Sequence, residues 1–122
     1  MEERAGFSGG DGLMSPDGEL FEVTILPSAM MDIVRGRYFY DQFEFGLGQR
    51  FRDYIVDEID KLQENAGVDS KRMSYHCRLA NRFHQTIYYR LEGRVVTVWR
   101  VLDQRFDPRR VDACLRDPDF KS

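Results

Sequence analysis

The sequence predicts an α+β domain in which a helical hairpin packs on a four-stranded antiparallel sheet, in the order β-α-α-β-β-β with a short final helix. Three observations lead to this fold. A β-prone stretch at 21–26 precedes two segments, within 28–65, whose apolar residues recur every three or four positions. Two alternating runs, at 83–91 and 95–102, flank Glu92-Gly93, where glycine suits a tight hairpin turn. The 122 residues are enough for one such domain.

Proline separates the first strand from the first helix. The stretch 21–26 (FEVTIL) alternates, and Pro27 ends it. Ser28 is predicted to cap the following helix, because serine favours the N-cap position. The buried face predicted for this helix comprises Ala29, Ile33, Gly36, Tyr40 and Phe43. Gly36 on that face indicates close packing against a neighbour.

A second helix follows the glycine-rich turn at 46–48. Its inward face is predicted to comprise Phe51, Ile55, Ile59 and Leu62. Gly67 is predicted to end this helical segment in the left-handed conformation. The next strand is predicted over 72–79, ahead of the hairpin. In the last strand, strict alternation places Val95, Thr97, Trp99 and Val101 opposite Val96, Val98, Arg100 and Leu102.

The end of the chain predicts one short helix. Asp107 is placed to cap it, and Pro108 suits its first position. Its predicted buried residues are Val111, Cys114 and Leu115. The folded domain is therefore expected to span 21–115, between flexible tails at 1–20 and 116–122 that carry few apolar anchors.

Composition and cysteine content indicate a cytoplasmic protein. No run of about 18 apolar residues is present, so no membrane-spanning helix is predicted. The first residues lack a basic start and an apolar core, and a signal peptide is not expected. Cys77 and Cys114 are then expected to be reduced. The two cysteines and two histidines have no spacing typical of zinc ligands, and no metal or other cofactor is expected.

The formal net charge of −3 conceals a strong asymmetry. Residues 1–70 carry six basic and fifteen acidic side chains, whereas residues 71–110 carry ten basic and three acidic ones. Such a distribution predicts a basic sheet on an acidic helical layer. The basic side could meet an acidic protein segment or nucleic acid, and it could also be only a solvated face.

Three segments resemble the RelE/ParE superfamily of toxins from type II toxin–antitoxin systems. The first is YFYDQ at 38–42 with GLGQRF at 46–51, and the second is RFHQTIYYR at 82–90. The third is VWRVLDQRFDP at 98–108. Their order and spacing resemble the ParE branch most. His84 stands where the family usually has proline, and Asp103 where histidine is common.

The resemblance implies a toxin of a plasmid-stabilisation or similar system. It implies growth inhibition by binding a target such as DNA gyrase, and neutralisation by a cognate antitoxin. Two alternatives stay open: a RelE-like, ribosome-dependent mRNA endoribonuclease, and a non-toxic interaction module of the same fold. A homodimer and a heterotetramer with the antitoxin both stay open as assemblies.

The candidate site residues follow the arginine-rich hairpin and tail. Those expected to bind the target or antitoxin are Arg78, Arg82, Tyr88, Arg100, Arg105, Arg109 and Arg110. RNA cleavage would need an acid and a base beside cations on the phosphate. The candidates for that chemistry are His76, His84, Arg82 and Arg100. RNA-cleaving relatives use a C-terminal tyrosine or histidine that is missing after Arg105, so catalysis is not the favoured reading.

Overall fold

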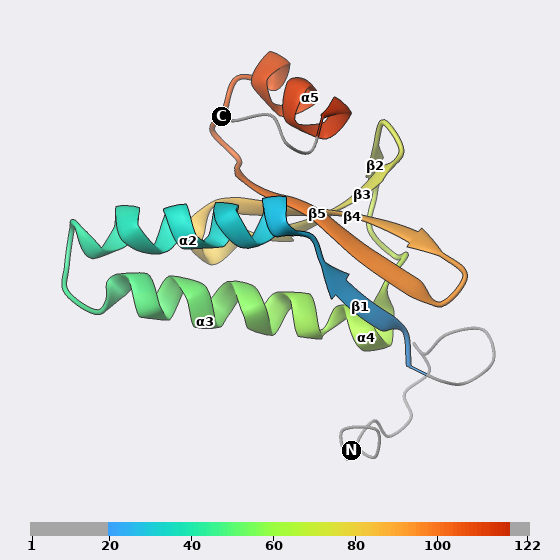
Figure 1. The fold of residues 1–122 in the computed structure, drawn as a ribbon, viewed down its shortest axis with the longest axis horizontal. Coiled ribbons are helices and arrows are strands. Elements are labelled where there is room, and N and C mark those ends of the chain that lie inside the picture. The colour runs from blue at the N-terminus through green and yellow to red at the C-terminus, as the bar shows by residue number, and fades with distance from the viewer. Residues whose placement is uncertain (1–19, 118–122) are drawn as a thin grey trace.

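A computed structural model of the protein describes residues 20–117 (Figure 1). The elements in chain order are β1 Glu22–Ile25, α2 Pro27–Asp41, α3 Leu47–Asp60, α4 Leu62–Asn65, β2 Lys71–Arg72, β3 Tyr75–Ala80, the 3-10 turn η1 Asn81–Phe83, β4 Gln85–Glu92, β5 Val95–Asp103 and α5 Pro108–Arg116. The tails expected at 1–20 and 116–122 lie almost entirely outside the described residues.

The predicted α+β class is confirmed, but residues 20–117 form a sheet of five strands instead of four. Their order is β1-β5-β4-β3-β2, and β1 pairs with β5 in parallel while the other pairs are antiparallel. The additional strand arises because the segment predicted as one strand over 72–79 turns at Met73-Ser74. Met73 has φ of 60°, a left-handed conformation that separates β2 from β3.

A β-bulge in β5 changes which side chains face the helices. Tyr88 pairs with Arg100, whereas the next residue, Tyr89, pairs with Val98, so Trp99 is the extra residue. Val98 and Val101 consequently pack in the helix-side core, and Trp99 packs on the other side. The strict alternation predicted for 95–102 is therefore wrong beyond Val98.

Helices α2 and α3 lie side by side on one face of the sheet (Figure 1). The predicted inward face of α3 is confirmed, because Phe51, Ile55, Ile59 and Leu62 are all buried. Gly36 is also confirmed as a close contact, since a Cβ there would collide with the ring of Phe51. Buried side chains of the helix-side core are Phe21, Ala29, Ile33, Phe51, Ile55, Ile59, Leu62, Ala66, Ala80, Ile87, Tyr89, Val96, Val98 and Val101.

Two predictions about α2 are wrong. Phe43 lies beyond the last helical residue, Asp41, and its side chain is 68% exposed. Ser28 lies inside the helix after the N-cap residue Leu26, and its hydroxyl donates to the Trp99 carbonyl (2.8 Å). Pro27 occupies the start of the helix, where a missing N–H costs nothing.

The second face of the sheet is partly covered by α5. Asp107 accepts a hydrogen bond from the Arg109 amide (2.8 Å), which confirms the predicted cap. The second core cluster comprises Tyr75, Tyr88, Leu102, Val111, Cys114 and Leu115. The Tyr75 hydroxyl also donates to the Leu115 carbonyl at the end of α5 (2.8 Å). The final helix thus belongs to the packed domain.

Candidate partner-binding face

The edge of β5 changes its neighbour halfway along the strand. β1 pairs with it only as far as Ile25 opposite Val98. Beyond that point, side chains of α2 replace the missing strand. Ser28 satisfies the Trp99 carbonyl, and the Asp32 carboxylate accepts from the Val101 amide (2.9 Å). This arrangement holds α2 against the last part of β5.

Arg100 is buried in an ion pair with Asp32. Its Nε and Nη2 atoms donate to the two carboxylate oxygens, each at 2.7 Å, and the Arg100 side chain is only 1% exposed. Burial acts to lower the pKa of Arg100, but hydrogen bonding to Asp32 and its charge outweigh that effect and raise the pKa. The expectation that Arg100 meets a ligand or a phosphate does not fit this placement, because its charge is already compensated.

A groove runs between α2 and this edge of β5, and we call it the edge groove. It has a volume of about 320 Å³. Its lining residues are Asp32, Arg35, Gly36, Phe39, Tyr40, Gln85, Val101, Leu102, Asp103, Phe106 and Arg110. Arg35 and Arg110 are exposed at its borders, and the Arg110 guanidinium lies over the Phe106 ring, 3.7 Å from the centroid. The groove therefore combines apolar side chains with two bordering cations, of which Arg35 also contacts the Asp32 carboxylate at 3.5 Å.

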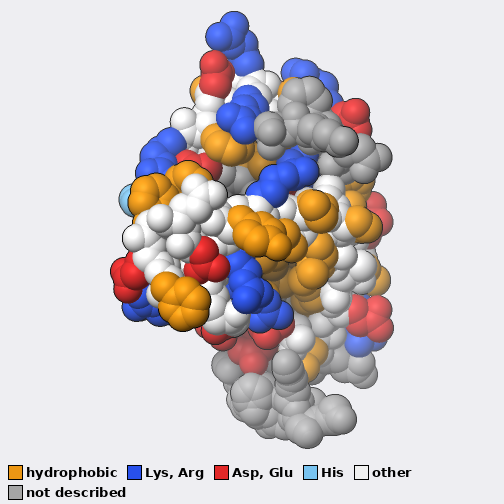
Figure 2. All heavy atoms as spheres, turned by 60° about the vertical axis from the view of Figure 1, so that its left-hand side comes forward, with side chains coloured by type: hydrophobic (Ala, Val, Ile, Leu, Met, Phe, Trp, Pro, Cys, Tyr) orange, Lys and Arg blue, Asp and Glu red, His pale blue; other side chains and the backbone are white. Residues whose placement is uncertain are grey.

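A second hollow, the tip cup, adjoins the edge groove where α2 ends and β4 begins. It measures about 330 Å³. Its lining residues are Phe39, Tyr40, Phe43, Leu47, Arg82, Phe83, His84 and Arg105. Phe39 and Tyr40 line both hollows, so the two form one continuous surface. Figure 2 brings the α2–α3 end of the molecule forward and shows apolar side chains gathered beside basic ones on this face.

Arg105, another predicted binding residue, is exposed at the tip cup but is not a free cation. Its Nε and Nη2 atoms donate to Asp103 at 2.8 and 2.7 Å. This hydrogen bonding holds the pKa of Asp103 below its ordinary value. Arg82, also on the rim, is exposed, and its guanidinium lies 5.6 Å from the centre of the Tyr54 ring.

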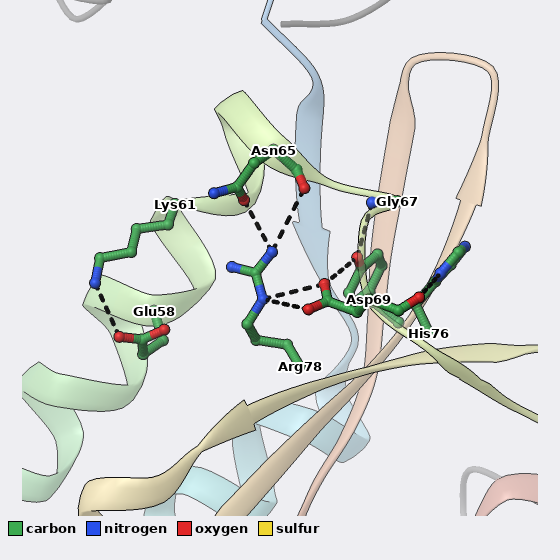
Figure 3. Close-up of polar contacts among 8 residues, drawn as sticks. Glu58, Lys61, Asn65, Gly67, Asp69, His76 and Arg78 are labelled. Carbon is green, nitrogen blue, oxygen red and sulfur yellow. Dashed lines mark hydrogen bonds and ion pairs between the residues drawn. The ribbon is translucent and has the colours of Figure 1, made fainter. Parts of the chain in front are cut away.

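Arg78 belongs to a polar network on the other side of the molecule (Figure 3). Its Nε donates to the Asp69 carboxylate (2.9 Å), and its Nη2 donates to the side-chain oxygen of Asn65 (2.9 Å). Asp69 also accepts from the Tyr89 hydroxyl (2.6 Å). The network joins the loop after α4 to β3 and β4. Arg78 consequently stabilises the fold and is not placed to meet a partner.

Of the remaining predicted binding residues, one is buried and two are exposed. Tyr88 is only 7% exposed beneath α5, and burial raises its pKa, so its predicted binding role does not fit its placement. Arg109 and Arg110 are exposed on the first turn of α5. Three further lining residues of the edge groove were not among the predicted binding residues: Arg35, Phe39 and Phe106. One signal could have found this side of α2: Met31, Arg35 and Phe39 follow one another at i, i+4 and i+8 and place two exposed apolar side chains beside a cation.

The residues considered for RNA cleavage do not meet in one place. His76 pairs with Tyr89 near the end of β4, while His84 precedes its first residue. Five strand positions of about 3.4 Å each place them roughly 17 Å apart. The His76 Nδ1 lies 3.1 Å from the Asp69 carbonyl, and the His76 ring stacks on Tyr89.

Other site classes find little support in the part of the chain that the structure describes. Both cysteines are free. Within residues 20–117, no three histidine, cysteine, aspartate or glutamate side chains gather as metal ligands. The same residues contain no helix with the length and apolar character needed to cross a membrane.

A solved structure shares this fold. A chain from the structure "Chromosomal ParDE TA system from P. aeruginosa" superposes with a TM-score of 0.62 at 17% identity, and the match covers 69% of this chain and 96% of that chain. No protein-family model matches the sequence, and no significant match was found among curated proteins. The expected likeness to ParE-type proteins is therefore confirmed as a likeness of fold.

Proposed function

We propose that this protein is the toxin of a type II toxin–antitoxin system, of ParE-like type. It acts in the cytoplasm by binding a target, and an antitoxin neutralises it. The observation that carries the proposal is an exposed apolar face with cations at its borders, on a fold shared with a chain of a ParDE system. Exposed apolar patches bordered by polar residues are typical of protein-binding sites.

The chemistry of this face supports an acidic, amphipathic segment as the antitoxin's contact. Apolar side chains of such a segment would bury Phe39 and Phe106, which lie in the edge groove. Its carboxylates would meet Arg35 and Arg110, which are exposed at the borders. Charge complementarity of this kind contributes to specificity and to the association rate.

A growth assay in a bacterial host tests whether the protein is a toxin. We expect inducible expression in a bacterial host to arrest growth, and co-expression of the neighbouring open reading frame to restore it. Unhindered growth of cells that contain soluble protein would instead support a non-toxic interaction module. A supercoiling assay with purified DNA gyrase tests the gyrase target; undiminished supercoiling at saturating protein would remove gyrase and leave the toxin assignment to the growth test.

The endoribonuclease alternative has a separate test. Primer extension on translated messages after induction would reveal cuts if the protein cleaved RNA. The dispersed positions of His76, His84 and Arg100 do not favour it, because acid, base and phosphate-binding groups must converge on one bond. We expect no cuts that depend on these side chains.

A further inference from the structure

The tip cup is a preformed aromatic pocket. Tyr40 contacts Phe83 edge-on at 5.0 Å between centroids, and its hydroxyl donates to the Phe83 carbonyl (3.2 Å). Phe39 contacts both Tyr40 and Phe43 edge-on, each at 5.1 Å. Edge-to-face contacts of this kind stabilise the positions of neighbouring rings. The pocket can therefore receive an apolar side chain with little rearrangement.

Several of these rings are exposed to water. Phe43 is 68% exposed, Phe39 is 49% exposed, and Phe45 in the adjoining turn is 99% exposed. Such a concentration of exposed aromatic area is unfavourable in a protein without a partner. Aromatic side chains are also the ones that most often dominate binding energies at protein interfaces.

The rim of the cup carries one positive charge that is not compensated. Arg105 is held by Asp103. Within residues 20–117, Arg82 forms no ion pair, and its guanidinium lies 5.6 Å from the centre of the Tyr54 ring. Asp53 and Asp57 line a separate hollow that Arg82 also borders. Their carboxylates instead contact other cations, Asp53 with Arg52 and Asp57 with Lys61.

His84 fixes the backbone at this rim. It has φ of 58°, in a region that residues other than glycine seldom adopt. Its carbonyl accepts a hydrogen bond from the Gln104 amide (2.7 Å). Strained backbone positions of this kind concentrate at ligand-binding sites. His84 here ends the 3-10 turn that contains Arg82 and Phe83, and all three residues line the cup.

We propose that the tip cup binds an apolar side chain flanked by a carboxylate, presented by the acidic antitoxin segment that lies in the edge groove. The side chain fills the space among Phe39, Phe43 and Phe83, and the carboxylate accepts from Arg82. The shared walls at Phe39 and Tyr40 let one segment occupy both hollows. The inference rests on the proposed function for the identity of the partner only; the pocket chemistry is tested without it.

The test uses the full chain and a minimal probe. N-acetyl-phenylalanine carries a phenyl ring beside a carboxylate, and its primary amide lacks only the charge. Titration is followed by the backbone amide NMR signals of Phe43, Phe83 and His84. We expect saturable shifts with the carboxylate and at least fivefold weaker binding of the amide. Equal binding of the two compounds, shifts that map elsewhere, or no saturable shifts would each overturn the proposal.

Two variants test whether Arg82 is the cation that binds the carboxylate of the probe. Arg82→Gln should remove the preference for the carboxylate, whereas Arg94→Gln, which changes the same residue type in the β4–β5 turn, should leave it unchanged. Loss of the preference in both variants would show that net charge, not the rim of the cup, selects the probe. If the probe binds as expected but the neighbouring reading frame's product does not bind, the pocket stands and the proposed function fails. If that product binds the wild type and Arg82→Gln equally, the proposed function stands and this inference fails.

Discussion

Asp32 and Arg100 lie 68 positions apart in the sequence and form a bidentate ion pair at the point where β1 stops pairing with β5. The same carboxylate accepts the Val101 amide, so one side chain compensates a buried charge and satisfies an unpaired strand edge. Asp32 also lines the edge groove, so this pair joins α2 to β5 at the groove itself. The proposed binding face therefore requires an intact Asp32–Arg100 ion pair.

Removing the carboxylate should therefore destabilise the whole domain. Asp32→Ala leaves the Arg100 guanidinium buried without a counter-charge, which typically costs about 3–5 kcal/mol. Urea unfolding monitored by circular dichroism measures the change. Arg35→Gln is the control, because Arg35 is half-exposed and its contact with Asp32 is 3.5 Å long. A loss below about 1 kcal/mol for Asp32→Ala would show that the pair is dispensable.

The contact between α2 and α3 should not tolerate a methyl group at Gly36. A Cβ at this position collides with the Phe51 ring, and overpacking of a core typically costs about 1–3 kcal/mol. Gly36→Ala should lower the thermal midpoint, and adding Phe51→Leu should recover part of the loss by removing ring atoms. If the loss of stability in the double variant exceeds the sum of the losses in the two single variants, the clash is not the cause.

The strained turn between β2 and β3 should be improved by glycine. Met73 has φ of 60° and is half-exposed, so Met73→Gly relieves the left-handed conformation and loses little buried surface. We expect a gain of about 1 kcal/mol in unfolding free energy. Ser74→Gly, at the next position with negative φ, should give no gain. Equal effects at both positions would show that flexibility, and not relieved strain, is responsible.

Alkaline pH should destabilise the network around Asp69. Burial and then the hydrogen bond to Asp69 raise the pKa of Tyr89 above its ordinary value of 10. The folded protein thus holds the phenolic proton more tightly than the unfolded chain does. The stabilisation of the folded state by this proton is complete below pH 10. It is lost as the pH rises above 10 through the raised pKa of Tyr89 in the folded state. Unfolding free energies of the wild type and Tyr89→Phe, measured from about pH 8 to 11, should converge as the pH rises. Curves that stay parallel would contradict the assignment.

The helical layer was predictable because its information is local. The spacing of Phe51, Ile55 and Ile59 alone identifies the buried face of α3, and Asp107-Pro108 alone identifies the start of α5. The sheet was less predictable. The bulge at Trp99 depends on the register between two strands, and the break at Met73 runs against the preference of its residue type.

The candidate site was predictable only in part, because charge type does not reveal accessibility. Arg78 and Arg100 lie in strands and were expected to be accessible, yet Asp69, nine positions before Arg78, and Asp32, 68 positions before Arg100, hold their guanidinium groups. Arg82 and Arg110 are exposed as expected. Charge reversal at Arg100 would therefore test folding as well as docking, whereas charge reversal at Arg35 would test docking at the edge groove.

The most direct test of the proposed binding face is the affinity of the purified protein for the product of the neighbouring reading frame, measured by calorimetry. Arg35→Glu with Arg110→Glu reverses the two cations of the edge groove, and Lys71→Glu with Arg94→Glu makes the same change in net charge at the opposite end of the sheet. We expect at least a hundredfold loss of affinity for the first pair and less than a threefold change for the second, with both variants folded. Equal losses of affinity in the two double variants, or an unchanged affinity of the groove variant, would contradict the proposed binding face.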